Sequence, residues 1–162
     1  MGHVLHTARL DLKLLEAVDA RALAEGAEGG SRRWAAGYPL GSSLLAAELT
    51  LAAAARETPL GAFGSYQMIR RADQRVIGDV GFMGPPDETG AVSLLCAFAV
   101  PARGQGYATE ALGALLEWAS GQEGLTCVLA DTTRSNHIAR RLLERVGFRS
   151  VGGDGELRYY ML

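Results

Sequence analysis

The glycine-rich turn at residues 103–108, with the sequence RGQGYA, has the composition of an anion-binding loop. It follows an apolar, buried-looking strand at 92–100 and leads into the helical pattern TEALGALLEWA. Glycine lets a ligand approach the main chain closely, and the N–H groups at a helix N-terminus favour negative charge. We therefore expect a ligand that carries phosphate at this turn.

Two common phosphate-binding motifs do not fit the turn. A P-loop requires Gly-Lys followed by Ser or Thr, and the only lysine of the chain is Lys13. The dinucleotide fingerprint G-x-G-x-x-G also breaks after Ala108. A nucleotide-binding α/β protein is therefore disfavoured. What remains is Arg-x-x-Gly-x-Ala after a strand, a far less common combination than a lone pair of glycines.

This remaining pattern resembles the cofactor loop of the GNAT acyltransferase superfamily, which reads Q/R-x-x-G-x-G/A. The continuation GYATEALGALLEWA is similar to the branch that acetylates N-terminal amines of ribosomal proteins and related small amines. A second block from Asn136, NHIARRLLERVGF, resembles that branch's Asn followed by a helix ending in Gly-Phe. The opening TARLDLKLLEAVDARAL resembles its first strand and helix, so the matches lie in family order across nearly the whole chain.

The resemblance implies that acetyl-CoA is the acyl donor. Its pyrophosphate would accept hydrogen bonds from the turn, and its pantetheine arm would pair with the backbone of the preceding strand. Asn136 matches the family residue that contacts the pantetheine arm, although it could instead be the N-cap of its helix. The expected coenzyme-binding residues are Phe98, Val100, Arg103, Gly104, Gln105, Gly106, Tyr107, Ala108 and Asn136.

The implied reaction is the direct attack of a primary amine, on a protein N-terminus or a small molecule, on the thioester carbonyl. It needs a base for the ammonium, stabilisation of the oxyanion and an acid for the thiolate. The glutamate that relatives carry early in their fourth strand is missing, and Ser93 stands near that position. The usual Tyr or Ser acid on the helix after Asn136 is also missing. The candidates for catalysis are Asp79, Ser93 and Tyr159, and no metal ligand is expected.

The missing glutamate leaves a second function open, a catalytically degenerate domain that binds acyl-CoA as a sensor or partner. Against it, enzymes of this kind can work by positioning two reactants, with bulk water as the base. Of the adjacent Tyr159 and Tyr160, strand alternation directs only one into the protein. No charge pattern in the chain identifies the acceptor amine.

The elements that would position these residues follow from the periodicity of apolar side chains. Helices are expected at 16–28, from 42 or 43 to about 56, from 106 and at 135–146, and strands at 9–15, 63–70, 75–83, 92–100, 125–130, 148–151 and 157–161. The strand–helix–strand unit after residue 92 implies a parallel pair in the middle of the sheet. We expect one α/β (α+β) domain over residues 1–162, with a GNAT-like, mostly antiparallel sheet of six to seven strands and helices on both faces.

The composition is that of an ordinary globular protein, with 48% hydrophobic and 21% charged residues. A net charge of −2 disfavours a broad nucleic-acid surface, for which a basic stripe would be expected. No apolar run approaches the roughly 20 residues of a membrane-spanning helix, and the N-terminus lacks a secretory pattern. A cytoplasmic protein with buried free thiols at Cys96 and Cys127 is expected, and the resemblance allows a homodimer.

Overall fold

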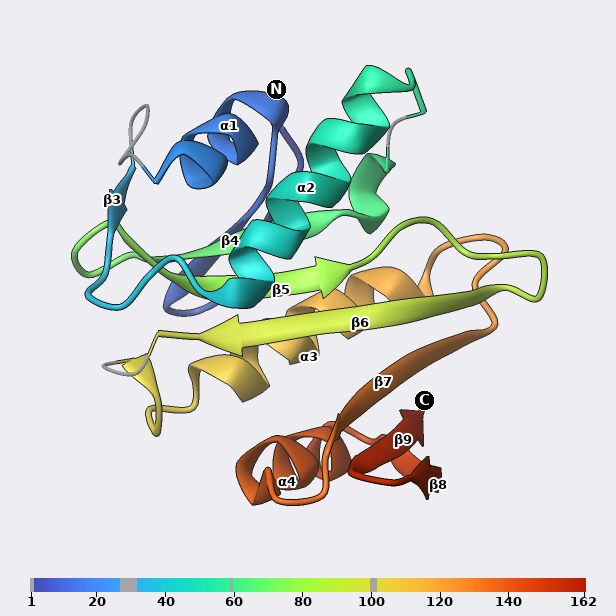
Figure 1. Ribbon diagram of the computed structural model, residues 1–162. Helices are drawn as coiled ribbons and strands as arrows, with labels where there is room; N and C mark the ends of the chain where they lie inside the picture. Colours follow the sequence, from blue (N-terminus) through green and yellow to red (C-terminus); the bar gives the residue numbers. More distant parts are fainter. Residues whose placement is uncertain (1, 27–31, 59, 100–101) are drawn as a thin grey trace.

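The computed structural model describes residues 2–26, 32–58, 60–99 and 102–162 (Figure 1). Its strands are β1 (Val4–His6), β2 (Leu10–Leu14), β3 (Arg33–Trp34), β4 (Ser65–Arg70), β5 (Arg75–Phe82), β6 (Ala91–Phe98), β7 (Cys127–Thr133), β8 (Arg149–Asp154) and β9 (Leu157–Met161). Its helices are α1 (Ala17–Glu25), α2 (Gly41–Ala55), the 3-10 helix η1 (Gly61–Phe63), α3 (Tyr107–Ser120) and α4 (His137–Arg145). None of these described helices is both long and apolar enough to cross a membrane.

The described strands form a single mixed sheet in the order β1-β2-β4-β5-β6-β7-β9-β8, with β3 paired to β5 outside this path. Within the described ranges, β6–β7 and β3–β5 are the parallel pairs, and the other pairs are antiparallel. The expected fold class is confirmed, and so are all seven expected strands. The short strands β1 and β3 raise the count to nine, because two or three residues give no readable alternation.

The helices cover the two faces of the sheet in pairs, with α1 and α2 on one face and α3 and α4 on the other (Figure 1). The side chains of successive strand residues point to opposite faces of the sheet and therefore pack in different cores. Met68 on β4 packs in the core beneath α3 with Leu112, whereas its neighbour Ile69 packs beneath α1 and α2 with Leu23. Each such buried aliphatic side chain contributes roughly 1.5–3 kcal/mol. The sheet is thus a fixed platform for residues at its strand ends.

Strands β6 and β7 pair only at their beginnings and then diverge. Their parallel register runs from Ala91 opposite Cys127 to Ser93 opposite Leu129. Beyond this point β6 continues to Phe98 beside β5, while β7 continues beside β9. Figure 1 shows the two arrows separating. In the described chain no strand fills this opening, so main-chain groups along its sides are available to a ligand.

Candidate active site

A cleft of about 600 Å³ lies where β6 and β7 diverge, between the sheet and the helices α3 and α4. Most of the residues expected to bind the coenzyme line this cleft, namely Phe98, Arg103, Gly104, Gly106, Tyr107, Ala108 and Asn136. Gln105 belongs to the same turn but is not among the lining residues, and Val100 lies outside the described residues. The structure therefore brings two distant parts of the sequence, the glycine turn and the start of α4, to one cleft.

Alternate residues of β6 direct their main-chain groups into the opening. The N–H of Ala99 donates to the carbonyl of Ile77 on β5 at 2.8 Å, so the odd-numbered residues of this segment pair with β5. The even-numbered residues, including Cys96 and Phe98, therefore point their N–H and C=O groups the other way. The carbonyl of Phe98 accepts a hydrogen bond from Nε of Arg103 at 3.2 Å. This edge of β6 can pair with an extended ligand as a further strand would.

The glycine turn enters α3 through two residues in the left-handed conformation. Gly104 has φ 76° and Gly106 has φ 79°, values that only glycine adopts without strain. Gly106 is the N-cap residue of α3, and no side chain of the described chain caps the helix there. The first N–H groups of α3 and the helix dipole are thus available to a phosphate.

Arg9, in the connection between β1 and β2, fixes this turn from the outside. Its Nε forms an ion pair with Glu110 at 2.7 Å, and its Nη1 donates to the carbonyl of Gln105 at 2.9 Å. Its guanidinium also lies 4.3 Å from the centre of the Tyr107 ring. Burial acts to raise the pKa of Glu110, but hydrogen bonds from Thr7 and Arg9 outweigh it and hold the pKa below its ordinary value. Glu110 therefore positions the turn.

Three arginines give the cleft a positive wall, Arg103 on the turn and Arg141 and Arg145 on α4. Residues four apart share one side of a helix, so Arg141 and Arg145 act on the same region. Guanidinium groups suit a ligand with several phosphate oxygens. Our sequence reasoning missed Arg141 and Arg145. The four-residue spacing of these arginines could have indicated a shared binding surface, but charged residues on a solvent-exposed helix face show the same spacing.

Asn136 is the N-cap of α4 and also lines the cleft. Its Oδ1 accepts a hydrogen bond from the N–H of Ala139 at 3.1 Å. The cap uses the oxygen of the amide, and within the described residues its Nδ2 donates no hydrogen bond. The two roles considered for Asn136, cap and ligand contact, are therefore compatible.

Asp79 lies on β5 beneath α2 and is not among the residues that line the cleft. It is 0% exposed, and its Oδ1 accepts a hydrogen bond from the hydroxyl of Tyr38 at 2.8 Å. The hydroxyl of Ser43 donates to its other oxygen. Burial raises the pKa of Asp79 to about 6, although these two hydrogen bonds act in the opposite direction. In this structure the carboxylate is therefore buried, held by two hydrogen bonds and not exposed to an amine in the cleft.

A chain of buried polar side chains continues from Asp79 toward α1. Nε2 of Gln67 donates to the hydroxyl of Tyr38 at 3.2 Å, and Arg32 donates to Oε1 of the same glutamine. Arg32 also lies 3.4 Å from a carboxylate oxygen of Asp19. These contacts connect α1 and the segment before α2 to the middle of the sheet, which is a structural role.

Tyr159, the third candidate for catalysis, is the outward-facing member of a tyrosine pair on β9. It is 37% exposed, whereas Tyr160 is 1% exposed and accepts a hydrogen bond from Nε of Arg140 at 3.2 Å. The expectation that only one of the two points inward is confirmed, and Tyr160 is the inward one.

Ser93 lies on the same side of the sheet as Tyr159 and is also exposed. It is opposite Leu129 on β7, and Leu129 is opposite Met161 on β9, two residues from Tyr159. On β6 the residue opposite Asp79 is Ala97. Ser93 precedes Ala97 by four residues, which corresponds to about 13 Å along the strand. By the same spacings Ser93 and Tyr159 are about 12 Å apart. None of the three candidates for catalysis is among the residues that line the cleft.

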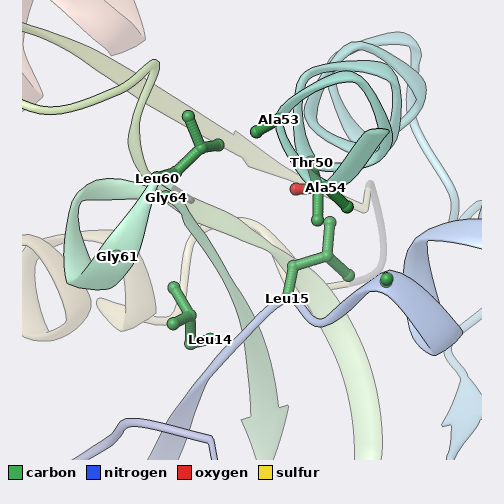
Figure 2. Close-up of a pocket in the computed structure, with 9 residues that line it drawn as sticks. Leu14, Leu15, Thr50, Ala53, Ala54, Leu60, Gly61 and Gly64 are labelled. Carbon is green, nitrogen blue, oxygen red and sulfur yellow. The ribbon is translucent and has the colours of Figure 1, made fainter. Parts of the chain in front are cut away.

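A second hollow of about 230 Å³ lies between the end of β2, α2 and η1 (Figure 2). Its described walls are apolar except for Thr50, whose hydroxyl donates to the carbonyl of Ala46 at 2.8 Å. The side chains of Leu14, Leu15 and Leu60 project into it. No charged side chain is among its described lining residues, so this hollow does not suit a ligand with phosphate groups.

Comparisons with known proteins identify the family to which the chain belongs. The family model described as Acetyltransferase (GNAT) domain matches residues 9–149. An uncharacterized N-acetyltransferase of Bacillus subtilis (strain 168), YjdG, is 30% identical over 99 residues, or 61% of this chain. The aligned region spans 59% of the length of that relative.

Solved structures show the same fold. The ribosomal-protein-S5-alanine acetyltransferase from Vibrio fischeri is 11% identical with a TM-score of 0.71, covering 99% of this chain and 96% of its own. RimL, a ribosomal L7/L12 alpha-N-protein acetyltransferase in complex with coenzyme A, is 13% identical with a TM-score of 0.70, covering 99% and 97%. At such identities the likeness concerns the fold alone. Because the family model matches most of its length, the chain carries an acetyltransferase domain and belongs to the GNAT family, whose acyl donor is acetyl-CoA.

Proposed function

We propose that this protein transfers the acetyl group of acetyl-CoA to a primary amine, on a protein N-terminus or a small molecule. The observation that carries this proposal is the cleft at the divergence of β6 and β7. Within the described residues it combines a helix N-terminus without a side-chain cap, the edge of β6 beyond Ser93 that no strand pairs, and three arginines. These are the groups that a pyrophosphate on an extended amide-containing arm requires.

In this proposal each part of the donor has its own binding groups. The pyrophosphate lies on the N–H groups of the turn from Arg103 to Ala108, with the nearby arginines neutralising its charge. The pantetheine arm pairs with the backbone of β6 at Phe98 and meets the Nδ2 group of Asn136. The pairing expected at Val100 lies outside the described residues. The thioester then reaches the middle of β6, where a backbone N–H can stabilise the oxyanion.

The amine attacks the thioester directly. The C–N bond forms, the C–S bond breaks, and the nitrogen loses its protons to the thiolate and to solvent. Holding both reactants in one cleft supplies much of the rate. Ser93, near the start of β6, and Tyr159, on β9, stay candidates as donors of a proton or a hydrogen bond.

A sensor that binds acetyl-CoA without transferring its acetyl group is the second candidate. The observation that favours it is β6 itself, which carries no acidic residue between Ala91 and Phe98. A homodimer and a cytoplasmic location stay predictions from the sequence.

Titration calorimetry with acetyl-CoA, followed by thiol release with a panel of amines, tests both functions. We expect binding of acetyl-CoA and thiol release with at least one primary amine. Binding without thiol release for any amine would favour the sensor, and the absence of binding would exclude both functions. ATP serves as the control ligand, because its triphosphate tests the turn without a pantetheine arm.

Substitutions of Asn136 should separate its two roles. Asn136→Ala removes the cap, which lowers the free energy of unfolding by about 1 kcal/mol. It also removes the amide group, which weakens acetyl-CoA binding by about 1 kcal/mol. Asn136→Ser retains a capping oxygen but lacks Nδ2, so it should lose affinity and keep its stability. Calorimetry and thermal unfolding measure the two effects, and unchanged affinity in both variants would restrict Asn136 to capping.

A further inference from the structure

The lining of the cleft includes residues that belong to both faces of the sheet. Successive residues of a strand point to opposite faces, yet the lining includes three consecutive residues of β7, Ala130 to Thr132. Ala130 packs against the core beneath α3 and α4, so its neighbour Asp131 belongs to the opposite face. On β6 the lining likewise includes Phe98 and its neighbour Ala97. An acceptor can therefore reach the opening from the face that the donor does not occupy.

Asp131 is the one acidic residue among the described residues that line the cleft. Its side chain is exposed, and within the described ranges it makes no hydrogen bond or ion pair. A carboxylate repels an acyl donor that carries several phosphates, so binding of the donor does not explain why Asp131 lies in the cleft. The negative charge of Asp131 suits a cation instead. The acceptor of the proposed reaction is such a cation, because a primary amine is protonated at neutral pH.

Exposed apolar side chains lie beside Asp131 on the same face. In the antiparallel register Asp131 is opposite Tyr159, and Leu129 is opposite Met161. Leu129, Tyr159 and Met161 are each 37% exposed, and we call these three residues the apolar row. Figure 1 shows α1 and α2 over β4 and β5, away from β7 and β9. Side chains opposite each other on paired strands are about 5 Å apart, so the apolar row lies within reach of a group held at Asp131.

We propose that Asp131 binds the ammonium group of the acceptor and that the apolar row contacts the apolar group attached to that amine. This inference rests on the proposed function and names its substrate class, a primary amine next to an aromatic or aliphatic group. A polyamine is disfavoured because its next charge would lie against the apolar row and lose its hydration. Asp131 is a binding residue in this assignment, and the proton released before the attack passes to solvent.

Asp131→Asn keeps the size of the side chain and removes its charge. We expect the KM for the amine to rise by about tenfold or more, the usual value of a charge-assisted contact, with a smaller change in kcat. The affinity for acetyl-CoA should stay unchanged or increase, since a repulsive charge is gone. Glu123→Gln, an exposed acidic residue outside the cleft lining, is the matched control and should change neither constant. Thermal unfolding checks that both variants fold.

The amine panel tests the apolar row with two sources of the same chemistry. One arm compares 2-phenylethylamine with ethylenediamine, and the other compares peptides that begin with Phe or with Asp. We expect a higher kcat/KM for the apolar member of the pair that reacts, and Met161→Ser should reduce that preference. Equal rates within both pairs, or an unchanged KM for the amine in Asp131→Asn, would overturn the inference. An enzyme that binds acetyl-CoA but acetylates no amine would instead overturn the proposed function.

Discussion

Gly106→Val should abolish the binding of acetyl-CoA, with a loss of affinity of about 100-fold or more. Gly106 has φ 79° at the N-cap of α3, and a β-branched residue is strained in that conformation. A Cβ atom there would also stand 3.4 Å from Nη2 of Arg9, the residue that fixes the turn. The turn would lose its shape and the N–H groups that receive the pyrophosphate, and two charge-assisted hydrogen bonds account for about this loss. Titration calorimetry measures the affinity.

Gly124→Val is the matched control, because it introduces the same strain outside the cleft. Gly124 has φ 81°, and a Cβ atom at this position meets no atom within 4 Å. Both variants should therefore lose about 1–2 kcal/mol of stability through the left-handed conformation. Only Gly106→Val should lose its affinity for acetyl-CoA. Wild-type affinity in Gly106→Val would contradict the placement of the pyrophosphate on this turn.

The sequence could predict the parts of the fold that local pattern determines. Alternating or continuous apolar runs identified the seven longer strands, and glycine with helical periodicity identified the turn before α3. Boundaries were less predictable. The first helix was expected at 16–28, but α1 ends at Glu25, because Gly26 adopts φ 68° and forms its C-cap. The strand expected at 125–130 is β7 at Cys127–Thr133, and its polar last residues gave no strand signal.

That last boundary explains why Asp131 was not among the candidates. It lies one residue beyond the expected strand, so no face of the sheet could be assigned to it. The ion pair of Arg9 with Glu110 could not be predicted either, since about a hundred residues separate the two in the sequence. Asp79 was a candidate for catalysis, because alternation cannot show that α2 covers this part of the sheet. Local sequence predicted the donor turn, and tertiary contacts decided the rest of the site.

The buried carboxylate of Asp79 should make stability depend on pH in an unusual direction. Its pKa is about 6 in the folded protein and about 4 in an unfolded chain, so between these values the folded state binds more protons. Its contribution is therefore fully present below about pH 4 and is lost as pH rises through about 6. The loss amounts to roughly 3 kcal/mol at pH 7. Asp73, whose pKa the hydrogen bond from Arg70 lowers, contributes in the opposite direction.

Asp79→Asn should remove this dependence, because the amide resembles the protonated acid. Its oxygen can still accept from Tyr38, and its Nδ2 can donate to the hydroxyl of Ser43. The variant should match the wild type near pH 4 and exceed its stability by up to roughly 3 kcal/mol at pH 7. Denaturant unfolding between pH 4 and pH 8 measures the difference, and Asp73→Asn should show the opposite sign. Because Asp79 is buried and is not among the residues that line the cleft, thiol release should persist in Asp79→Asn. A fall in kcat of about a thousandfold without a change in stability would instead identify Asp79 as the base, reached through a motion of α2.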